Sequence, residues 1–66
     1  MFCVHQGNQV MFFDEAHNMI GSLILDSDVV SAYVNESGVG GAVCVDGSCY
    51  EITCRPYEGT HYYRVN

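Results

Sequence analysis

The stretch Gly40–Cys54, GGAVCVDGSCYEITC, predicts a β-hairpin and carries three of the chain's four cysteines. Its Asp46-Gly47 pair is the strongest hairpin-turn signal in the chain, because such tight turns need residues that accept a positive φ. A two-residue loop at Asp46-Gly47 places Cys44 directly opposite Cys49. Side chains alternate between the faces of a strand. The predicted core face carries Val43, Val45, Tyr50, Ile52 and Cys54.

This register determines what the cysteines can do. Opposed side chains of a non-hydrogen-bonded pair lie about 4.5–5.5 Å apart at Cβ, which is compatible with a disulfide between Cys44 and Cys49. In the reducing cytosol we expect two thiols instead. Cys54 points to the other face, and the C-x2-C spacing of structural zinc sites is missing, so no metal or other cofactor is expected. The alternative is a metal- or thiol-dependent module built on Cys3, His5, Cys44 and Cys49.

The chain contains two further turn signals outside this hairpin. The RPYEGT segment at 55–60 predicts a turn before a last strand in HYYRV, which completes a three-stranded antiparallel meander. Near the N-terminus, Gly7-Asn8 separates two short apolar runs, MFCVHQ and QVMFF, and predicts a second hairpin.

The middle of the chain is predicted to be helical. In DEAHNMIGSLIL, residues 14–25, apolar side chains recur at helical spacing behind two acidic residues, although Met19–Leu25 could instead form a strand paired with QVMFF. In the next segment Ser27 is a suitable N-cap, a stripe of valines and Tyr33 follows, and Gly38 suits the C-terminal end. The predicted fold is therefore α+β: one domain, 1–66, with an N-terminal hairpin, a C-terminal meander and one or two short helices.

The charge balance restricts the kind of partner. The chain has eight carboxylates against two arginines, contains no lysine and carries a net charge of −6. Direct nucleic-acid or anionic-membrane binding needs the opposite sign, since lysine and arginine supply that affinity. A basic surface of a nucleic-acid-binding protein complex is the expected partner, and the protein is expected to be monomeric.

The acidic residues are the candidate binding site. If the two predicted helices are neighbours, five carboxylates gather at one end of the molecule, and Glu58 lies on the meander. A cluster without interspersed lysine suits steering onto a basic surface. The alternative is a structural interaction domain whose acids only confer solubility. The candidate partner-binding residues are Asp14, Glu15, Asp26, Asp28, Glu36 and Glu58.

The sequence contains no motif that points to catalysis or to export. Glycine-rich phosphate loops and the C-x-x-C pair of redox enzymes are missing, and a chain of 66 residues leaves little room for a water-excluding pocket. We therefore expect a protein that is not an enzyme. The N-terminus has neither a basic segment nor a long apolar one, and no apolar run approaches the roughly 20 residues that span a bilayer. The expected location is the cytoplasm of a host bacterial cell.

In length, lysine-free acidic composition and lack of enzymatic motifs, the chain resembles the small inhibitors that phages and mobile elements encode against bacterial defence systems, of which the anti-CRISPR proteins are the best known. The resemblance covers composition alone, so no residue is carried over from that group. It implies a steric, stoichiometric inhibitor whose acidic face occupies a DNA-binding surface, for example on a Cas effector, and prevents target-DNA binding.

Overall fold

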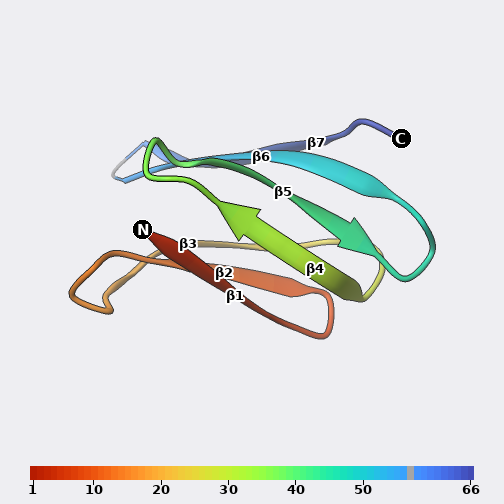
Figure 1. Ribbon diagram of the computed structural model, residues 1–66, viewed down its shortest axis with the longest axis horizontal. Helices are drawn as coiled ribbons and strands as arrows, with labels where there is room; N and C mark the ends of the chain where they lie inside the picture. The colour runs from red at the N-terminus through yellow and green to blue at the C-terminus, as the bar shows by residue number, and fades with distance from the viewer. Residues whose placement is uncertain (57) are drawn as a thin grey trace.

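The computed structural model describes residues 1–56 and 58–66, and all of its regular structure is β-strand (Figure 1). Within these residues there is no helix, and hence none that could span a membrane. The strands are β1 (Phe2–Gln6), β2 (Gln9–Phe13), β3 (Met19–Ile24), β4 (Val29–Val34), β5 (Val39–Cys44), β6 (Cys49–Arg55) and β7 (Gly59–Arg64).

The strands form two antiparallel sheets that lie one above the other in Figure 1. The first has the order β1-β2-β3 and the second the order β4-β5-β6-β7, so each strand pairs with its sequence neighbour within a sheet. The chain crosses between the sheets at 25–28. This crossing is tied to the β1–β2 turn, because the Leu25 N–H donates to the Asn8 carbonyl and the Val29 N–H donates to the Gly7 carbonyl, each at 2.8 Å.

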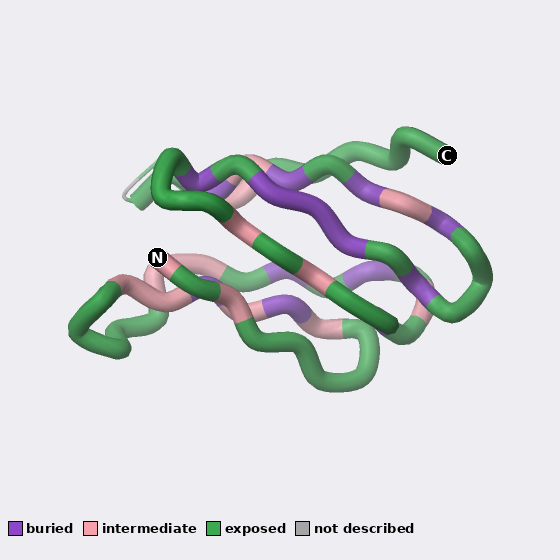
Figure 2. Tube along the Cα trace, in the orientation of Figure 1, coloured by how far each residue is buried: buried purple, intermediate pink, exposed green. Residues whose placement is uncertain are grey.

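The core lies between the two sheets. Burial follows the period of two that a strand imposes on its side chains, as in β2, where Val10 and Phe12 are buried and their neighbours are not. Figure 2 shows buried stretches in the strands of both layers and mostly exposed loops. The buried cluster consists of Val10, Phe12, Leu23, Leu25, Val29, Ala42, Cys44, Tyr50, Ile52 and Cys54.

The predicted α+β class is wrong, because both predicted helices are strands. The alternative considered for Met19–Leu25 is correct: β3 pairs antiparallel with β2. Gly21, which would weaken a helix, lies where the sheets approach closely, and a Cβ there would come within 2.3 Å of Thr60 Oγ1. In β4, Val29 is buried while Val30 is exposed, so the apparent helical stripe is divided between two faces. β-branched and aromatic residues fit such a pleated surface well, and tertiary packing overrides weak helical propensity.

The acidic start of the first predicted helix is a turn. The Asp14 carboxylate accepts a hydrogen bond from the Asn18 N–H at 2.9 Å, and the His17 N–H donates to the Asp14 carbonyl at 3.0 Å. His17 has a φ of 66°, a left-handed conformation that is uncommon outside glycine. Its ring packs edge-on against Phe2 with the centroids 5.4 Å apart. Aspartate side chains favour this kind of local bonding in turns as much as helix starts.

The N-terminal hairpin and the C-terminal meander are confirmed. Gln6 pairs with Gln9 around Gly7-Asn8, which is the predicted two-residue loop. β5, β6 and β7 pair in sequence order. The predicted 55–60 turn joins β6 to β7, and Tyr57 within it lies outside the described residues.

The register of the β5–β6 hairpin differs from the prediction by one residue. Cys44 bonds to Ser48, with its N–H donating to the Ser48 carbonyl at 2.9 Å, so the loop has three residues and Gly47 takes a φ of 86°. Asp46 supports this wider loop by accepting bonds from the Ser48 N–H at 2.9 Å and from its hydroxyl at 2.5 Å. A one-residue slip turns every side chain of a strand to the other face. Val43 is therefore exposed and Cys44 buried, opposite to the prediction, whereas the predicted faces of β6 are correct.

Candidate functional site

The loops alternate between the two ends of the molecule because consecutive strands run in opposite directions. The loops after β2, β4 and β6 share one end, at the left of Figure 1, and the loops after β1, β3 and β5 share the other. Of the six predicted partner-binding acids, Asp26 and Asp28 therefore lie at the opposite end from the rest, beside Asp46. We define the acidic end as the group Asp14, Glu15, Glu36 and Glu58.

Two loops of the acidic end, 14–18 and 35–38, are held by their own side chains. The Asn35 side-chain oxygen accepts bonds from the Ser37 N–H at 2.9 Å and the Val39 N–H at 3.0 Å, which fixes the backbone on both sides of Glu36. The Asn18 backbone N–H bonds the Asp14 carboxylate and lowers the pKa of Asp14. This carboxylate therefore stays ionised to lower pH than an ordinary aspartate. Asp14, Glu15 and Glu36 are therefore presented on short, braced loops.

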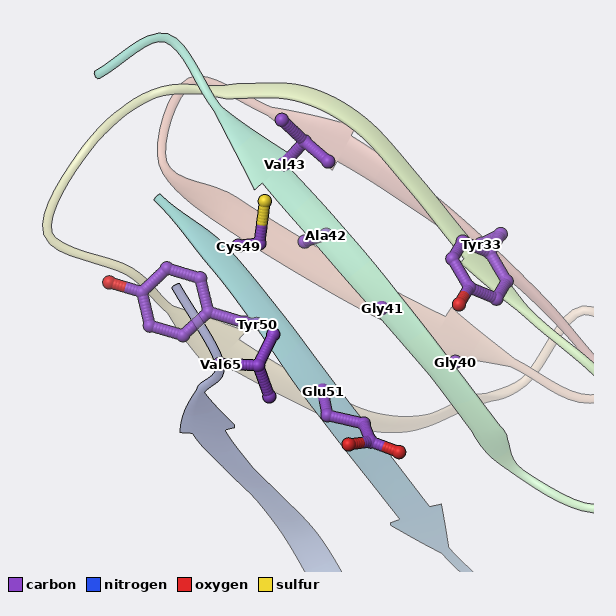
Figure 3. A pocket seen from close by; sticks show the side chains of 9 residues that line it. All are labelled: Tyr33, Gly40, Gly41, Ala42, Val43, Cys49, Tyr50, Glu51 and Val65. Carbon is purple, nitrogen blue, oxygen red and sulfur yellow. The ribbon is translucent and has the colours of Figure 1, made fainter. Parts of the chain in front are cut away.

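A second candidate surface is the outer face of the four-stranded sheet. The register aligns one residue from each strand in a single row across it: Tyr33, Gly41, Glu51 and Tyr63. Both tyrosines are exposed, Tyr33 by 68% and Tyr63 by 60%. A shallow depression of about 240 Å³ lies on this part of the sheet, and Figure 3 shows Tyr33 and Glu51 extending from the strands on either side of the β5 glycines. We call this row the tyrosine–glutamate row.

The carboxylate of this row is oriented by its neighbour. The Tyr63 hydroxyl donates a hydrogen bond of 2.5 Å to Glu51 Oε2. This bond, which holds the phenolic proton, raises the pKa of Tyr63. A neutral phenol does not cancel the charge of Glu51, so the row keeps one negative charge between two exposed aromatic rings.

The outer face of the three-stranded sheet is unusually apolar. Phe2 and Phe13 stack on it with their ring centroids 5.4 Å apart, and Val4 pairs with Met11 in the next row. The large apolar side chains that are exposed or half-buried there are Phe2, Val4, Met11, Phe13, Met19 and Ile24. The helical prediction for residues 14–25 concealed the part of this surface that lies on β3.

The cysteines are not brought together. Cys44 faces the core and is 2% exposed, whereas Cys49 lies in the outward row with Val43, so the disulfide considered between Cys44 and Cys49 does not form in this fold. All four cysteines are free thiols. The described residues contain no cluster of three or more histidine, cysteine or acidic side chains that could hold a metal ion, and the set Cys3, His5, Cys44 and Cys49 is divided between the sheets and their faces.

The thiols should react in a defined order. We expect Cys49, half-buried on the outer face, to be alkylated first. Cys3 should follow more slowly, because burial raises the pKa of its thiol and lowers the thiolate fraction. Cys44 and Cys54 should react only as the protein unfolds. Timed iodoacetamide labelling at pH 8 with peptide mapping measures this order, and the Cys49→Ser variant should lose the fast phase alone. Equal rates for Cys44 and Cys49 would contradict the observed register.

Comparison with known proteins gives no further guide to function. No protein-family model matches the chain, and no match was found among curated proteins or among solved structures.

Proposed function

We propose that this protein is a non-enzymatic, protein-binding inhibitor of the anti-CRISPR type, acting in the bacterial cytoplasm. Its acidic end would occupy a basic surface of a nucleic-acid-binding complex and so prevent DNA from binding there. The observation that carries the proposal is the convergence of Asp14, Glu15, Glu36 and Glu58 on one end of a chain that has no lysine.

Electrostatics supports this use of the acidic end. Carboxylates gathered without intervening positive charges repel one another, which destabilises a compact fold and is not the mixed pattern that solubility favours. The same field attracts a lysine- and arginine-rich surface and raises the rate of association with it. Arg55 lies at the end of β6 beside these loops and His17 lies within one of them, so the four carboxylates still keep an excess of negative charge.

The alternative of a metal- or thiol-based module has lost its geometric basis. That module required Cys44 and Cys49 on one face beside Cys3 and His5. Cys44 instead packs in the core opposite Val29. The alternative of a purely solubilising surface predicts that charge changes at either end have equally small effects, which the next experiment tests.

The test compares two variants of identical charge. Glu36→Lys with Glu58→Lys changes the acidic end, and Asp26→Lys with Asp28→Lys changes the opposite end by the same net charge. Each protein is immobilised and exposed to a bacterial lysate, and the nucleic-acid-binding proteins released by added duplex DNA are quantified by mass spectrometry at low and high salt. We expect the Glu36→Lys/Glu58→Lys variant to capture at least about tenfold less of the protein that duplex DNA releases. This reduction corresponds to roughly 1.4 kcal/mol.

The comparison of the two double variants, at low and high salt, tests the proposal. Capture by the Asp26/Asp28 variant should stay within about threefold of the wild type, and high salt should release the partner because exposed charges are screened. Equal losses in both variants, or capture that neither salt nor DNA affects, would overturn the proposal.

A further inference from the structure

We infer that the tyrosine–glutamate row binds an arginine side chain of the protein partner, with the guanidinium stacked on the exposed face of Tyr33, which covers Gly41, and paired with Glu51. This inference rests on the proposed function, since it assumes that the partner presents a basic surface. It adds a specific anchoring site on the face of the four-stranded sheet, separate from the charges of the acidic end.

The floor of the site is the Tyr33 ring, which packs over the backbone of Gly41. Gly41 has no side chain, and the Tyr33 ring lies across it: Cε1 and Oη come within 3.2 and 3.3 Å of the position a Cβ on Gly41 would occupy. The ring therefore packs down on β5, while most of its surface remains exposed. Figure 3 shows the Tyr33 hydroxyl directed toward the glycines of β5. A flat group can therefore lie on the exposed face of this ring.

The charge of the site comes from Glu51. It follows Gly41 in the same row, on the neighbouring strand β6. Tyr63 on the far side holds Oε2, which orients the carboxylate, and a second oxygen is left to accept a bond from a ligand. Arg64, one of the chain's two arginines, is directed elsewhere. Arg64 belongs to the inward row of Tyr50, and its Nε bonds to the Asn66 carbonyl.

The rest of the depression suits the aliphatic stem of a long side chain. Val43, Cys49 and Val65 line it on the side away from Tyr33. Val65 is held there by its N–H, which donates to the Cys49 carbonyl at 2.9 Å. The site thus offers an apolar wall, an aromatic face and a carboxylate within one shallow hollow.

This combination favours arginine over lysine. A guanidinium is planar, stacks on aromatic rings and gives a carboxylate two parallel N–H donors. An ammonium is a compact, strongly hydrated charge that gains less from the ring and has no planar match. Cation–π contacts at exposed sites are weak, so a single free arginine should bind only in the millimolar range, and the affinity of the whole interface would come from combining this anchor with the acidic end.

The experiment is an NMR titration of the ¹⁵N-labelled protein with three probes: N-acetyl-arginine methylamide, its lysine counterpart, and the citrulline counterpart, which has the shape of arginine without its charge. We expect saturable shifts from the arginine probe at the amides of Tyr33, Gly41 and Glu51. The lysine probe should bind about three- to fivefold more weakly, and the citrulline probe should cause no saturable change at these amides.

Variants assign the site. Glu51→Gln removes the charge and keeps the shape, and Tyr33→Leu keeps an apolar cover over Gly41 without the aromatic ring. Each should weaken the arginine probe at least about threefold. Glu36→Gln, which removes an equal charge from the acidic end, should leave these shifts unchanged. If Tyr33→Leu fails to fold, Glu51→Gln alone decides, because an exposed isosteric change leaves the core intact.

The outcomes separate this inference from the proposed function. Shifts centred on the acidic-end loops, equal affinity for lysine and arginine, or an unchanged response in Glu51→Gln would overturn the arginine site, even if the acidic end still captures a DNA-competed partner. Arginine binding at this row that Glu51→Gln abolishes would support the site, even if the lysate experiment gives no such partner and the proposed function fails.

Discussion

Replacing Gly40 with alanine is expected to leave the chain largely unfolded at 25 °C. Gly40 lies in β5 and pairs with Val34 on one side and Ile52 on the other. A Cβ there would come within 1.9 Å of the Tyr33 carbonyl oxygen and within 2.8 Å of the Val34 Cα. These are backbone atoms, which cannot rotate away, so β4 and β5 would have to separate.

The destabilisation expected from Gly40→Ala exceeds the free energy of unfolding that a domain of this size has. Overpacking against side chains already costs about 1–3 kcal/mol, and a domain of this size rarely gains more than about 3–5 kcal/mol from its core. Amide dispersion in a ¹⁵N spectrum and far-ultraviolet circular dichroism would show the loss of structure directly.

Gly47→Ala is the matched control for Gly40→Ala. Gly47 has a φ of 86° but no atom lies within 4 Å of the position its Cβ would take. Only the left-handed backbone then opposes the change, at about 1–2 kcal/mol, so this variant should remain folded with a lower melting temperature. A Gly40→Ala protein that melts within a few degrees of the wild type would show that β4 and β5 do not approach as closely as observed.

Replacing Phe12 with alanine is the second change expected to remove most of the stability. Phe12 is 0% exposed and is among the largest fully buried side chains. Truncating a buried phenylalanine costs about 3–5 kcal/mol, through lost burial and the cavity that remains. Urea unfolding followed by circular dichroism should give a midpoint near zero denaturant, or no folded baseline at all.

Phe13→Ala supplies the comparison, because the two phenylalanines are adjacent and chemically identical. Phe13 points outward and stacks on Phe2, and an aromatic pair of this kind contributes about 0.5–1.5 kcal/mol beyond its burial. Phe13→Ala should therefore unfold reversibly at a clearly measurable urea concentration. If Phe13→Ala were the more damaging change, β2 would present the opposite face to the core.

The tight turns were predictable from local chemistry. Gly7-Asn8 and Asp46-Gly47 carry residues whose backbone preferences suit reversal of the chain, and both mark the hairpins observed. The pairings of QVMFF and of CYEITC with the strands before them followed from those turns, and the pairing of CYEITC with the last strand followed from the RPYEGT turn. The candidate acids were also visible in the sequence, since exposed charge needs no tertiary information to be recognised.

The Asp46-Gly47 dipeptide alone did not predict the length of the hairpin loop. Two- and three-residue loops both use glycine at this position, and here the bonds from Ser48 to Asp46 accompany the longer one. The difference of one residue reversed the faces of β5, and with them the predicted position of Cys44. The tyrosine–glutamate row was hidden by two errors. The wrong register did not pair Gly41 with Glu51, and the helical prediction for β4 did not place Tyr33 beside Gly41.

The amino-acid sequence by itself determined the positions of the tight turns, the β-hairpins at both ends and the negative charge of the surface, because these depend on the preferences of single residues and near neighbours. Tertiary structure decided that residues 19–34 are strands, which face of β5 is buried and which acids share an end. The physical reason is that a short apolar segment satisfies helical and strand patterns almost equally well. Only burial against a second sheet, which involves residues far apart in the chain, makes one of them lower in free energy.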